Sequence, residues 1–312
     1  MLSLRARLFL FVLRNRHLLK GRLRPDTGAD WEHDLDRVRA EAAKSSRLMG
    51  KLPQGVRDLP VEAPNPAPVP AAWLIPENAP EGKVLLYFRG GGYVLGDLDM
   101  HKNITAKFAQ GTGLRTLLFD YRRAPEHPYP AALDDSLTVY RWLRGQGYAA
   151  KDVVLCGDSA GGGLLLAMLL TLKDAGEELP AGAAALSPWT DVACTGESVA
   201  ANSRRCLAPR LSWLACQKHY TQGQDATQPY ISPLYGDLSG LPPLLLYCGE
   251  YETLRDDSVR FHDKALAAGV DSRLHVGSGM CHCYPACAPI FPEATRALAD
   301  ICGFLKNKAM AA

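Results

Sequence analysis

A serine between small residues is the first candidate for chemistry in this sequence. Residues 157–161 read Gly-Asp-Ser-Ala-Gly, which fits the pattern Gly-x-Ser-x-Gly, between a predicted strand at 153–156 and a predicted helix at 161–175. A serine at a sharp strand-to-helix turn is exposed as a nucleophile, and small neighbours let strand and helix approach closely. We therefore predict that Ser159 is the nucleophile. The alternative, a phosphate-binding loop, would need a Gly-Lys-Ser/Thr ending that this turn lacks.

A glycine-rich loop follows an earlier predicted strand. Residues 89–93 read Arg-Gly-Gly-Gly-Tyr, directly after the apolar run at 84–88. Successive glycines let a backbone turn its N–H groups inward, where they can stabilise the negative oxygen of a tetrahedral intermediate. We predict an oxyanion hole formed by Gly91, Gly92 and Ala160, the last of which benefits from the start of the following helix. The alternative is a loop that is merely flexible.

One histidine of eight has the position of a general base. His282 lies in the loop between the predicted strand at 272–276 and the predicted helix at 292–305. The chain order Ser, acid, His is the order that α/β hydrolases use, so we predict that His282 activates Ser159. The neighbouring Cys281, Cys283 and Cys287 raise the alternative of a zinc site, but they lack the usual two-residue gap, and no metal is predicted.

These motifs together resemble the hormone-sensitive-lipase family of bacterial esterases. That family carries His-Gly-Gly-Gly after the strand and Gly-Asp-Ser-Ala-Gly at the turn, and residues 120–128, Asp-Tyr-Arg-Arg-Ala-Pro-Glu-His-Pro, are similar to a third stretch of it. The resemblance runs from about residue 74 to 305. It implies the α/β-hydrolase fold and a serine carboxylester hydrolase that uses no cofactor. One departure stands out, since Arg89 replaces the family's histidine and must brace the oxyanion loop differently.

The acid of the triad is expected after the predicted strand at 244–248. In the family that the chain resembles, an aspartate occupies the place of Glu252, which implies that Glu252 orients the imidazole of His282. A glutamate can do this as well as an aspartate. Asp256 is the alternative, and a third interpretation is that the acidic residues of 249–257 only cap the helix predicted from residue 256.

The elements that would position these residues alternate along the chain. Strands are predicted at 84–88, 115–121, 153–156, 183–186, 244–248 and 272–276, with helices at 131–144, 161–175, 256–268 and 292–305. Such alternation predicts an α/β fold with a mostly parallel central sheet, helices on both faces and a helical lid. Residues 31–49 have a helical pattern, and the proline-rich residues 53–70 indicate a linker or an edge strand.

The predicted domain organisation is one catalytic core with a lid in two parts. Residues 51–189 and 236–312 form the core, while residues 1–50 and an insertion at 190–235 form the lid. Substrate is expected to meet Tyr93, Asp158, Trp189 and Trp213. Leu207, Leu211 and Tyr220 are further apolar candidates, either for the pocket or for packing within the lid. A small pocket under an N-terminal lid favours esters of short acyl chains.

Composition limits the partners and the compartment. The formal charge is +2, from 35 basic and 33 acidic residues, so no overall field recruits nucleic acid. Nine scattered cysteines argue against a disulfide framework and predict a cytoplasmic protein. The sequence has no stretch of about twenty apolar residues, so no membrane-spanning helix is predicted. Residues 1–24 alternate leucines with arginines and are interpreted as an amphipathic lid helix or, alternatively, as a weak membrane-surface contact. The oligomeric state is not predicted.

Two alternatives to a simple esterase stay open at this stage. The N-terminal pattern and the chain length are also similar to monoterpene lactone hydrolases of the same family, which would use the same triad on cyclic esters. Plant hormone receptors that resemble this family have lost the catalytic histidine and bind a small ligand without hydrolysing it. The presence of His282 favours an enzyme.

Overall fold

A single twisted sheet forms the centre of the computed structural model, which describes residues 2–19, 28, 30–46, 52–63 and 68–311. The strand order is β1-β2-β4-β3-β5-β6-β7-β8. The strands are β1 (Val56–Ala63), β2 (Val69–Pro76), β3 (Val84–Phe88), β4 (Arg115–Phe119), β5 (Val153–Asp158), β6 (Gly182–Leu186), β7 (Leu244–Gly249) and β8 (Ser272–Gly277). All neighbours from β4 to β8 pair in parallel, which confirms the predicted fold class.

The first two strands are antiparallel and lie at one edge. Most of β1 is exposed or half-buried, and Pro60 lies inside it. A proline cannot donate a ladder hydrogen bond, so it is tolerated on an edge strand. Of the two interpretations of residues 53–70, the edge strand is therefore confirmed for the described residues 56–63, while residues 64–67 lie outside the described part.

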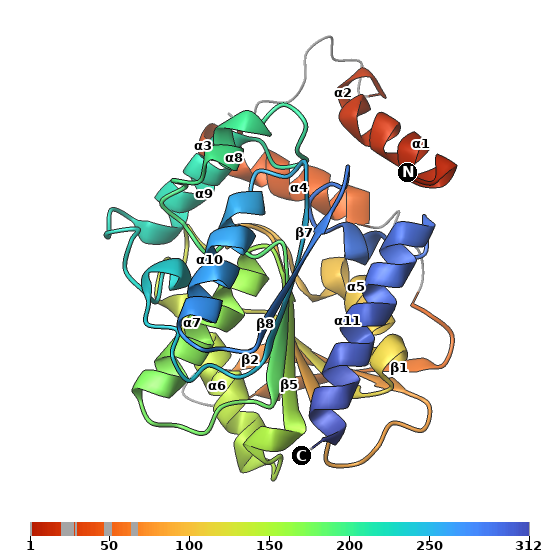
Figure 1. Ribbon diagram of the computed structural model, residues 1–312, viewed down its shortest axis with the longest axis vertical. Coiled ribbons are helices and arrows are strands. Elements are labelled where there is room, and N and C mark those ends of the chain that lie inside the picture. Colours follow the sequence, from red (N-terminus) through yellow and green to blue (C-terminus); the bar gives the residue numbers. More distant parts are fainter. Residues whose placement is uncertain (1, 20–27, 29, 47–51, 64–67, 312) are drawn as a thin grey trace.

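Helices cover both faces of the sheet (Figure 1). α5 (Leu98–Thr112) and α11 (Pro292–Met310) lie on one side, and α6 (Ala131–Gly145), α7 (Ala160–Asp174) and α10 (Arg255–Ala267) lie on the other. The strands β3, β5, β6 and β7 are buried along their whole length because both of their faces are covered. α5 is absent from the elements predicted above; it begins at the capping side chain of Asp97 and turns Ile104 and Phe108 toward the sheet.

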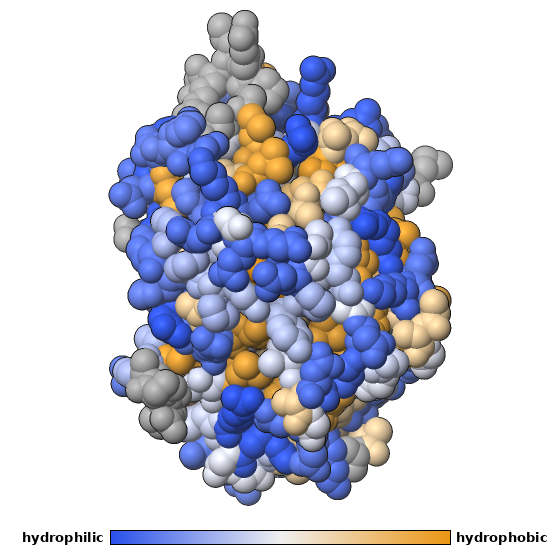
Figure 2. Space-filling model, turned by 90° about the vertical axis from the view of Figure 1, so that its left-hand side faces the viewer, coloured by the Kyte–Doolittle hydropathy of each residue, from blue (hydrophilic) through white to orange (hydrophobic). Residues whose placement is uncertain are grey.

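A cap of short helices lies at the end of the sheet where the parallel strands finish. It contains α3 (Asp30–His33), α4 (Leu35–Ser46), α8 (Glu197–Ala201) and α9 (Arg210–Thr221). The two parts of the cap touch, since His219 Nε2 lies 3.0 Å from the carbonyl oxygen of Trp31 and Lys218 pairs with Glu32 at 2.6 Å. Figure 2 shows a largely hydrophilic face, with one group of apolar side chains near this end of the molecule and others in its lower half.

The first helices stand apart from that cap. α1 (Leu4–Arg14) and α2 (Arg16–Leu19) follow one another, and α1 lies against the start of α11 (Figure 1). In the described part of the chain, every helix is too short or too polar to cross a lipid bilayer.

Candidate active site

Ser159 lies at the turn between β5 and α7, as predicted. Its backbone has a φ of 57° and a ψ of −123°, a conformation that L-residues rarely adopt. The turn is held because the Ser159 N–H donates to the carbonyl oxygen of Leu186 at 2.7 Å, and the Ser159 carbonyl accepts from Gly163 and Trp189. A Cβ at Gly161 would lie 2.1 Å from the carbonyl oxygen of Phe88, so the small neighbours of the serine are needed for helix and strand to meet.

His282 faces Ser159. Its Nε2 lies 3.0 Å from Ser159 Oγ, which is hydrogen-bond distance. The edge of the imidazole meets the ring of Trp213, with centroids 5.7 Å apart and planes at 72°. This contact and the burial of the His282 side chain, which is 8% exposed, hold the ring in the cavity wall.

Glu252 lies behind the histidine and is fully buried. Its Oε1 is 3.8 Å from His282 Nδ1, and neither atom has a hydrogen-bond partner within the described part of the chain. The second oxygen, Oε2, accepts from Ser187 Oγ at 2.8 Å and from the Gly249 N–H at 2.9 Å. These two bonds hold the carboxylate so that its remaining oxygen points at the imidazole.

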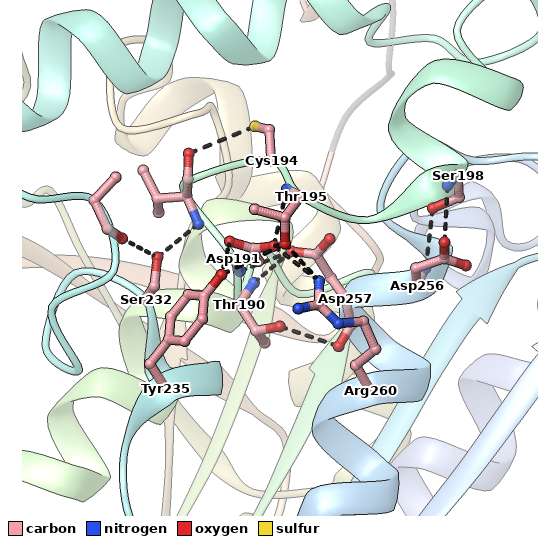
Figure 3. Close-up of polar contacts among 12 residues, drawn as sticks. Thr190, Asp191, Cys194, Thr195, Ser198, Ser232, Tyr235, Asp256, Asp257 and Arg260 are labelled. Carbon is pink, nitrogen blue, oxygen red and sulfur yellow. Dashed lines mark hydrogen bonds and ion pairs between the residues drawn. The ribbon is translucent and has the colours of Figure 1, made fainter.

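The alternative acid, Asp256, has other partners. Its carboxylate accepts from the Ser198 N–H at 2.8 Å, at the start of α8 (Figure 3). It also pairs with Arg255 at 2.8 Å. The next residue, Asp257, accepts from the N–H groups of Thr190 and Asp191. Of the acidic residues in 249–257, the structure therefore brings Glu252 to His282, while Asp256 and Asp257 attach the segment after β6 to α10.

Two glycines of the loop after β3 lie at the cavity beside Ser159. Gly91 has a φ of 119°, which a side chain would not allow, and a Cβ there would lie 2.3 Å from the Leu95 carbonyl oxygen. Gly91 and Gly92 both line the cavity that contains Ser159 and His282. Within the described residues, their N–H groups donate to no protein acceptor. They are thus available to an oxygen bound beside Ser159.

Arg89 braces this loop from inside the protein. Its side chain is fully buried, donates to the Leu95 carbonyl oxygen and to the Tyr121 carbonyl oxygen at 2.8 Å each, and pairs with Asp120 at 2.8 Å. The guanidinium also stacks 3.8 Å above the Tyr121 ring. The five donors of an arginine in a fixed plane can satisfy several acceptors at once. The departure at Arg89 is therefore accommodated by a dense set of contacts.

Asp158 braces the other side of the same loop. Its Oδ1 accepts from the Gly90 N–H at 3.2 Å and from the Tyr87 hydroxyl at 2.9 Å. Burial and, to a lesser extent, the nearby Asp158 carboxylate raise the pKa of Tyr87 well above its ordinary value, so the phenol stays a donor. The loop is thus fixed at Gly90 by Asp158 and at Leu95 by Arg89.

The cavity above Ser159 has a volume of about 470 Å³. Its walls come from α3 and α4, from α5, from the glycine loop, from residues 207–216 and from the His282 loop; they include Trp31, Val38, Ile104, Leu207, Trp213 and Cys216. Of the residues expected to meet substrate, Asp158 and Trp213 line this cavity. Leu207 also lines it, as one of its two interpretations expected.

Two of the residues expected to meet substrate, Tyr93 and Trp189, do not line this cavity. Tyr93 stacks on Tyr220, with centroids 3.8 Å apart, and Trp189 packs on Trp213 at 4.8 Å. Tyr93, Trp189 and Tyr220 are buried behind the cavity wall and do not line it, while Leu211 is 43% exposed at the surface. Aromatic residues in the core and in a pocket share the same sequence signal, so only their placement in the fold distinguishes them.

The cysteines around His282 do not assemble into a metal site. Among the described residues, no three of His, Cys, Asp and Glu are grouped to hold a metal ion. Burial, followed by the carboxylates of Asp158 and Glu252, raises the pKa of Cys283 well above its ordinary value, so this thiol stays protonated.

Comparison with known proteins shows the family of this chain. A family profile described as the alpha/beta hydrolase fold matches residues 85–286. A solved "esterase from the bacterial hormone-sensitive lipase (HSL) family" is 36% identical, with a TM-score of 0.88 over 98% of this chain and 99% of its own. The chain belongs to the hormone-sensitive-lipase family of α/β hydrolases.

Several relatives of this chain have names that state an activity. An "Acetyl-hydrolase" of Streptomyces hygroscopicus is 39% identical over 76% of this chain and 79% of its own length. An "Ethyl acetate hydrolase" of Pseudomonas putida is 32% identical over 85% and 87%. A solved "Esterase/Lipase from uncultured bacterium" is 34% identical, with a TM-score of 0.89 over 99% of this chain and the whole of that one.

Ser187 helps to position the site, and the sequence analysis did not identify it. Ser187 accepts from the Cys283 N–H at 2.9 Å and donates to Glu252, so it joins the acid to the histidine loop. The available signal was its place directly after β6, because the carboxyl ends of parallel strands meet at one edge.

Proposed function

We propose that this protein hydrolyses small carboxylic esters with Ser159 as nucleophile, His282 as general base and Glu252 as the acid that orients it. The observation that carries the proposal is the 3.0 Å separation of Ser159 Oγ and His282 Nε2, with Glu252 on the other side of the imidazole. A serine is a weak nucleophile until a neighbouring base takes its proton.

Acylation would begin when His282 Nε2 removes the Ser159 proton and Oγ attacks the ester carbonyl carbon. The carbonyl oxygen becomes negative and accepts hydrogen bonds from the N–H groups of Gly91, Gly92 and Ala160. His282, now charged, donates its proton to the alcohol oxygen, which leaves with an acyl group bound to Ser159. Glu252 stabilises the charged imidazole, and a small shift would shorten the 3.8 Å Glu252–His282 separation to a hydrogen bond.

Deacylation repeats these steps with water. His282 removes a proton from the water molecule, the hydroxide attacks the acyl carbon, and the same three N–H groups hold the oxyanion. The intermediate then releases the carboxylic acid, and Ser159 regains its proton from His282. No group other than these side chains and the backbone is needed for the cycle.

Short acyl chains fit the site best. The cavity of about 470 Å³ must hold both the acyl and the alcohol part, and Trp213 and Ile104 are among the side chains that line it. The names of the relatives, an acetyl-hydrolase and an ethyl acetate hydrolase, point in the same direction. They favour an ester hydrolase over a lactone hydrolase, and the intact pair of Ser159 and His282 favours it over a ligand-binding member of the fold.

We further propose that the lid consists of α3 and α4 with residues 190–235. Arg39 of α4 supports this assignment, since it donates to the Val94 carbonyl oxygen behind the glycine loop and pairs with Glu126 at 2.6 Å. The cytoplasmic location expected from the nine cysteines stays a prediction.

Hydrolysis of p-nitrophenyl esters from acetate to decanoate tests the proposal, with Ser159→Ala as the control. We expect turnover that is highest for acetate or butyrate and that disappears in the variant. A fluorophosphonate probe should label the wild type and not Ser159→Ala, because only an activated serine reacts. Turnover limited to lactones would indicate the lactonase, and absence of both turnover and labelling would leave a binding protein.

A further inference from the structure

The helix α1 is apolar on two opposite sides. Its inner side packs on the protein: Ala6 and Leu10 are buried in the apolar cluster that contains Phe291 of the α11 start, and Phe9 meets the Phe291 ring at 5.2 Å. Ser3 caps the helix and fastens it, because its N–H and its hydroxyl donate to the two carboxylate oxygens of Glu293 at 2.6 and 2.8 Å. These contacts explain how the inner side of α1 docks on the protein. They do not explain why the outer side is apolar as well.

The outer side carries a stripe of large apolar side chains. Leu4, Leu8, Phe11 and Val12 are 79%, 63%, 65% and 45% exposed. Since successive residues of a helix turn by about 100°, Leu4, Leu8 and Phe11 point in nearly one direction, with Val12 beside them. We call these four residues the outer stripe. Because these side chains are exposed to water, they add nothing to the stability of the packed helix.

Arginines border the outer stripe on both sides. By the same helical geometry Arg5 lies on one border, and Arg7 and Arg14 lie on the other; all three are exposed. The helix contains no acidic residue, and the first acid of the chain is Asp26. Apolar side chains between rows of arginine are the pattern of helices that lie in the plane of a membrane, where the long side chains reach the lipid phosphates.

We propose that the outer stripe of α1 and its bordering arginines bind an anionic lipid surface. Two copies meeting through this stripe would bring like charges together at both borders, which disfavours a dimer. The proposal is independent of the hydrolytic mechanism.

The position of α1 would bring that surface close to the site. The side chain of Leu2 lies against Gly279, and the Arg14 guanidinium lies 5.3 Å from the Tyr251 ring centre. Gly279 and Tyr251 belong to the loops that carry His282 and Glu252. An enzyme docked in this way would meet esters that partition into lipid.

Co-sedimentation of the full chain with vesicles tests the proposal. We expect binding to vesicles of phosphatidylglycerol and phosphatidylcholine at low salt, and much weaker binding to phosphatidylcholine alone or at high salt. The double variant L8E/F11E should weaken binding by roughly tenfold or more, and R5E/R7E by a similar factor. The matched control L266E/M310E removes apolar side chains that are 50% and 54% exposed on other helices, and it should bind like the wild type.

Two controls separate this proposal from the proposed function. Ser159→Ala should bind vesicles as the wild type does, and L8E/F11E should hydrolyse soluble p-nitrophenyl acetate at the wild-type rate. Equal sedimentation of L8E/F11E and L266E/M310E would overturn the proposal. Absence of vesicle binding by the wild type would also overturn the proposal. If the wild type then proved to be a dimer that L8E/F11E dissociates, the outer stripe would be a dimer contact instead.

Discussion

The two carboxylate oxygens of Glu252 have different surroundings. One oxygen is fixed by Ser187 and Gly249, and the other faces His282 with no other partner among the described residues. Changing Glu252 to Gln keeps the shape and removes the charge that stabilises the imidazolium. We expect kcat to fall by roughly a hundredfold to ten-thousandfold in steady-state ester hydrolysis.

The matched control is Asp256→Asn, the neighbouring acid that pairs with Arg255 and the start of α8. It should retain kcat within a few-fold and lose some stability. Equal losses of kcat in both variants would mean that Glu252 is not the orienting acid.

Arg89 is the residue at which this chain departs from the pattern of its family. Lysine at this position would keep a positive charge but could not donate to Asp120, Leu95 and Tyr121 together. We expect Arg89→Lys to lower kcat by more than tenfold with little change in KM, because a displaced oxyanion loop weakens transition-state binding most. An increase in KM at unchanged kcat would argue that the arginine acts on substrate binding instead.

At the scale of elements, the close approach of α7 to β3 depends on Gly161. A methyl group at Gly161 would need space that the Phe88 carbonyl occupies 2.1 Å away, so Gly161→Ala should lower the free energy of unfolding by about 1–3 kcal/mol or more. Gly303, inside α11, has open space around its Cβ position. Gly303→Ala should stabilise the protein by up to about 1 kcal/mol, and urea unfolding would measure both.

The joint between α10 and the segment after β6 holds a second buried carboxylate (Figure 3). Burial, and next the nearby Asp191 carboxylate, raise the pKa of Asp257 well above its ordinary value. Between the ordinary pKa of an unfolded aspartate and this raised value, the folded state binds a proton that the unfolded state has released. Stability is therefore lost as pH rises through that interval. Arg260, which pairs with Asp191 at 2.9 Å, moderates the effect.

Asparagine resembles protonated aspartate and does not titrate. We expect the free energy of unfolding of Asp257→Asn to depend less on pH than that of the wild type, with the variant gaining in relative stability from about pH 4 upward. Urea unfolding at several pH values measures this difference. A constant difference between the two proteins at every pH would contradict the raised pKa.

For the molecule as a whole, the N-terminal region divides into two parts with different tasks. Trp31 and Val38 of α3 and α4 line the cavity, whereas no described residue of α1 does. Trp31→Ala should therefore shift the preferred p-nitrophenyl ester toward longer acyl chains. Deleting residues 2–15 should lower the melting temperature, since Ala6, Phe9 and Leu10 leave the apolar cluster, but keep the chain-length profile of the folded enzyme. A changed profile in the deletion would make α1 part of the lid.

Local patterns were enough to predict the core fold and the turn between β5 and α7 at which Ser159 lies. Apolar runs buried on both faces identify parallel strands, and a serine between small residues at a strand-to-helix junction is typical of a nucleophile turn. His282 followed from chain order. α5 was missed because several of its buried positions carry polar residues, such as His101, Thr105 and Thr112, which weaken the apolar periodicity of the segment.

What the sequence could not determine depends on contacts between distant segments. It left Glu252 and Asp256 both open, since only the packing of β6 against β7 places Ser187 beside one of them. It could not distinguish Trp213, in the cavity wall, from Trp189 behind it, because both are buried aromatic residues and differ only in what lies on their far side. The two apolar sides of α1 were likewise indistinguishable until the docking of one side on Phe291 showed which side is left to solvent.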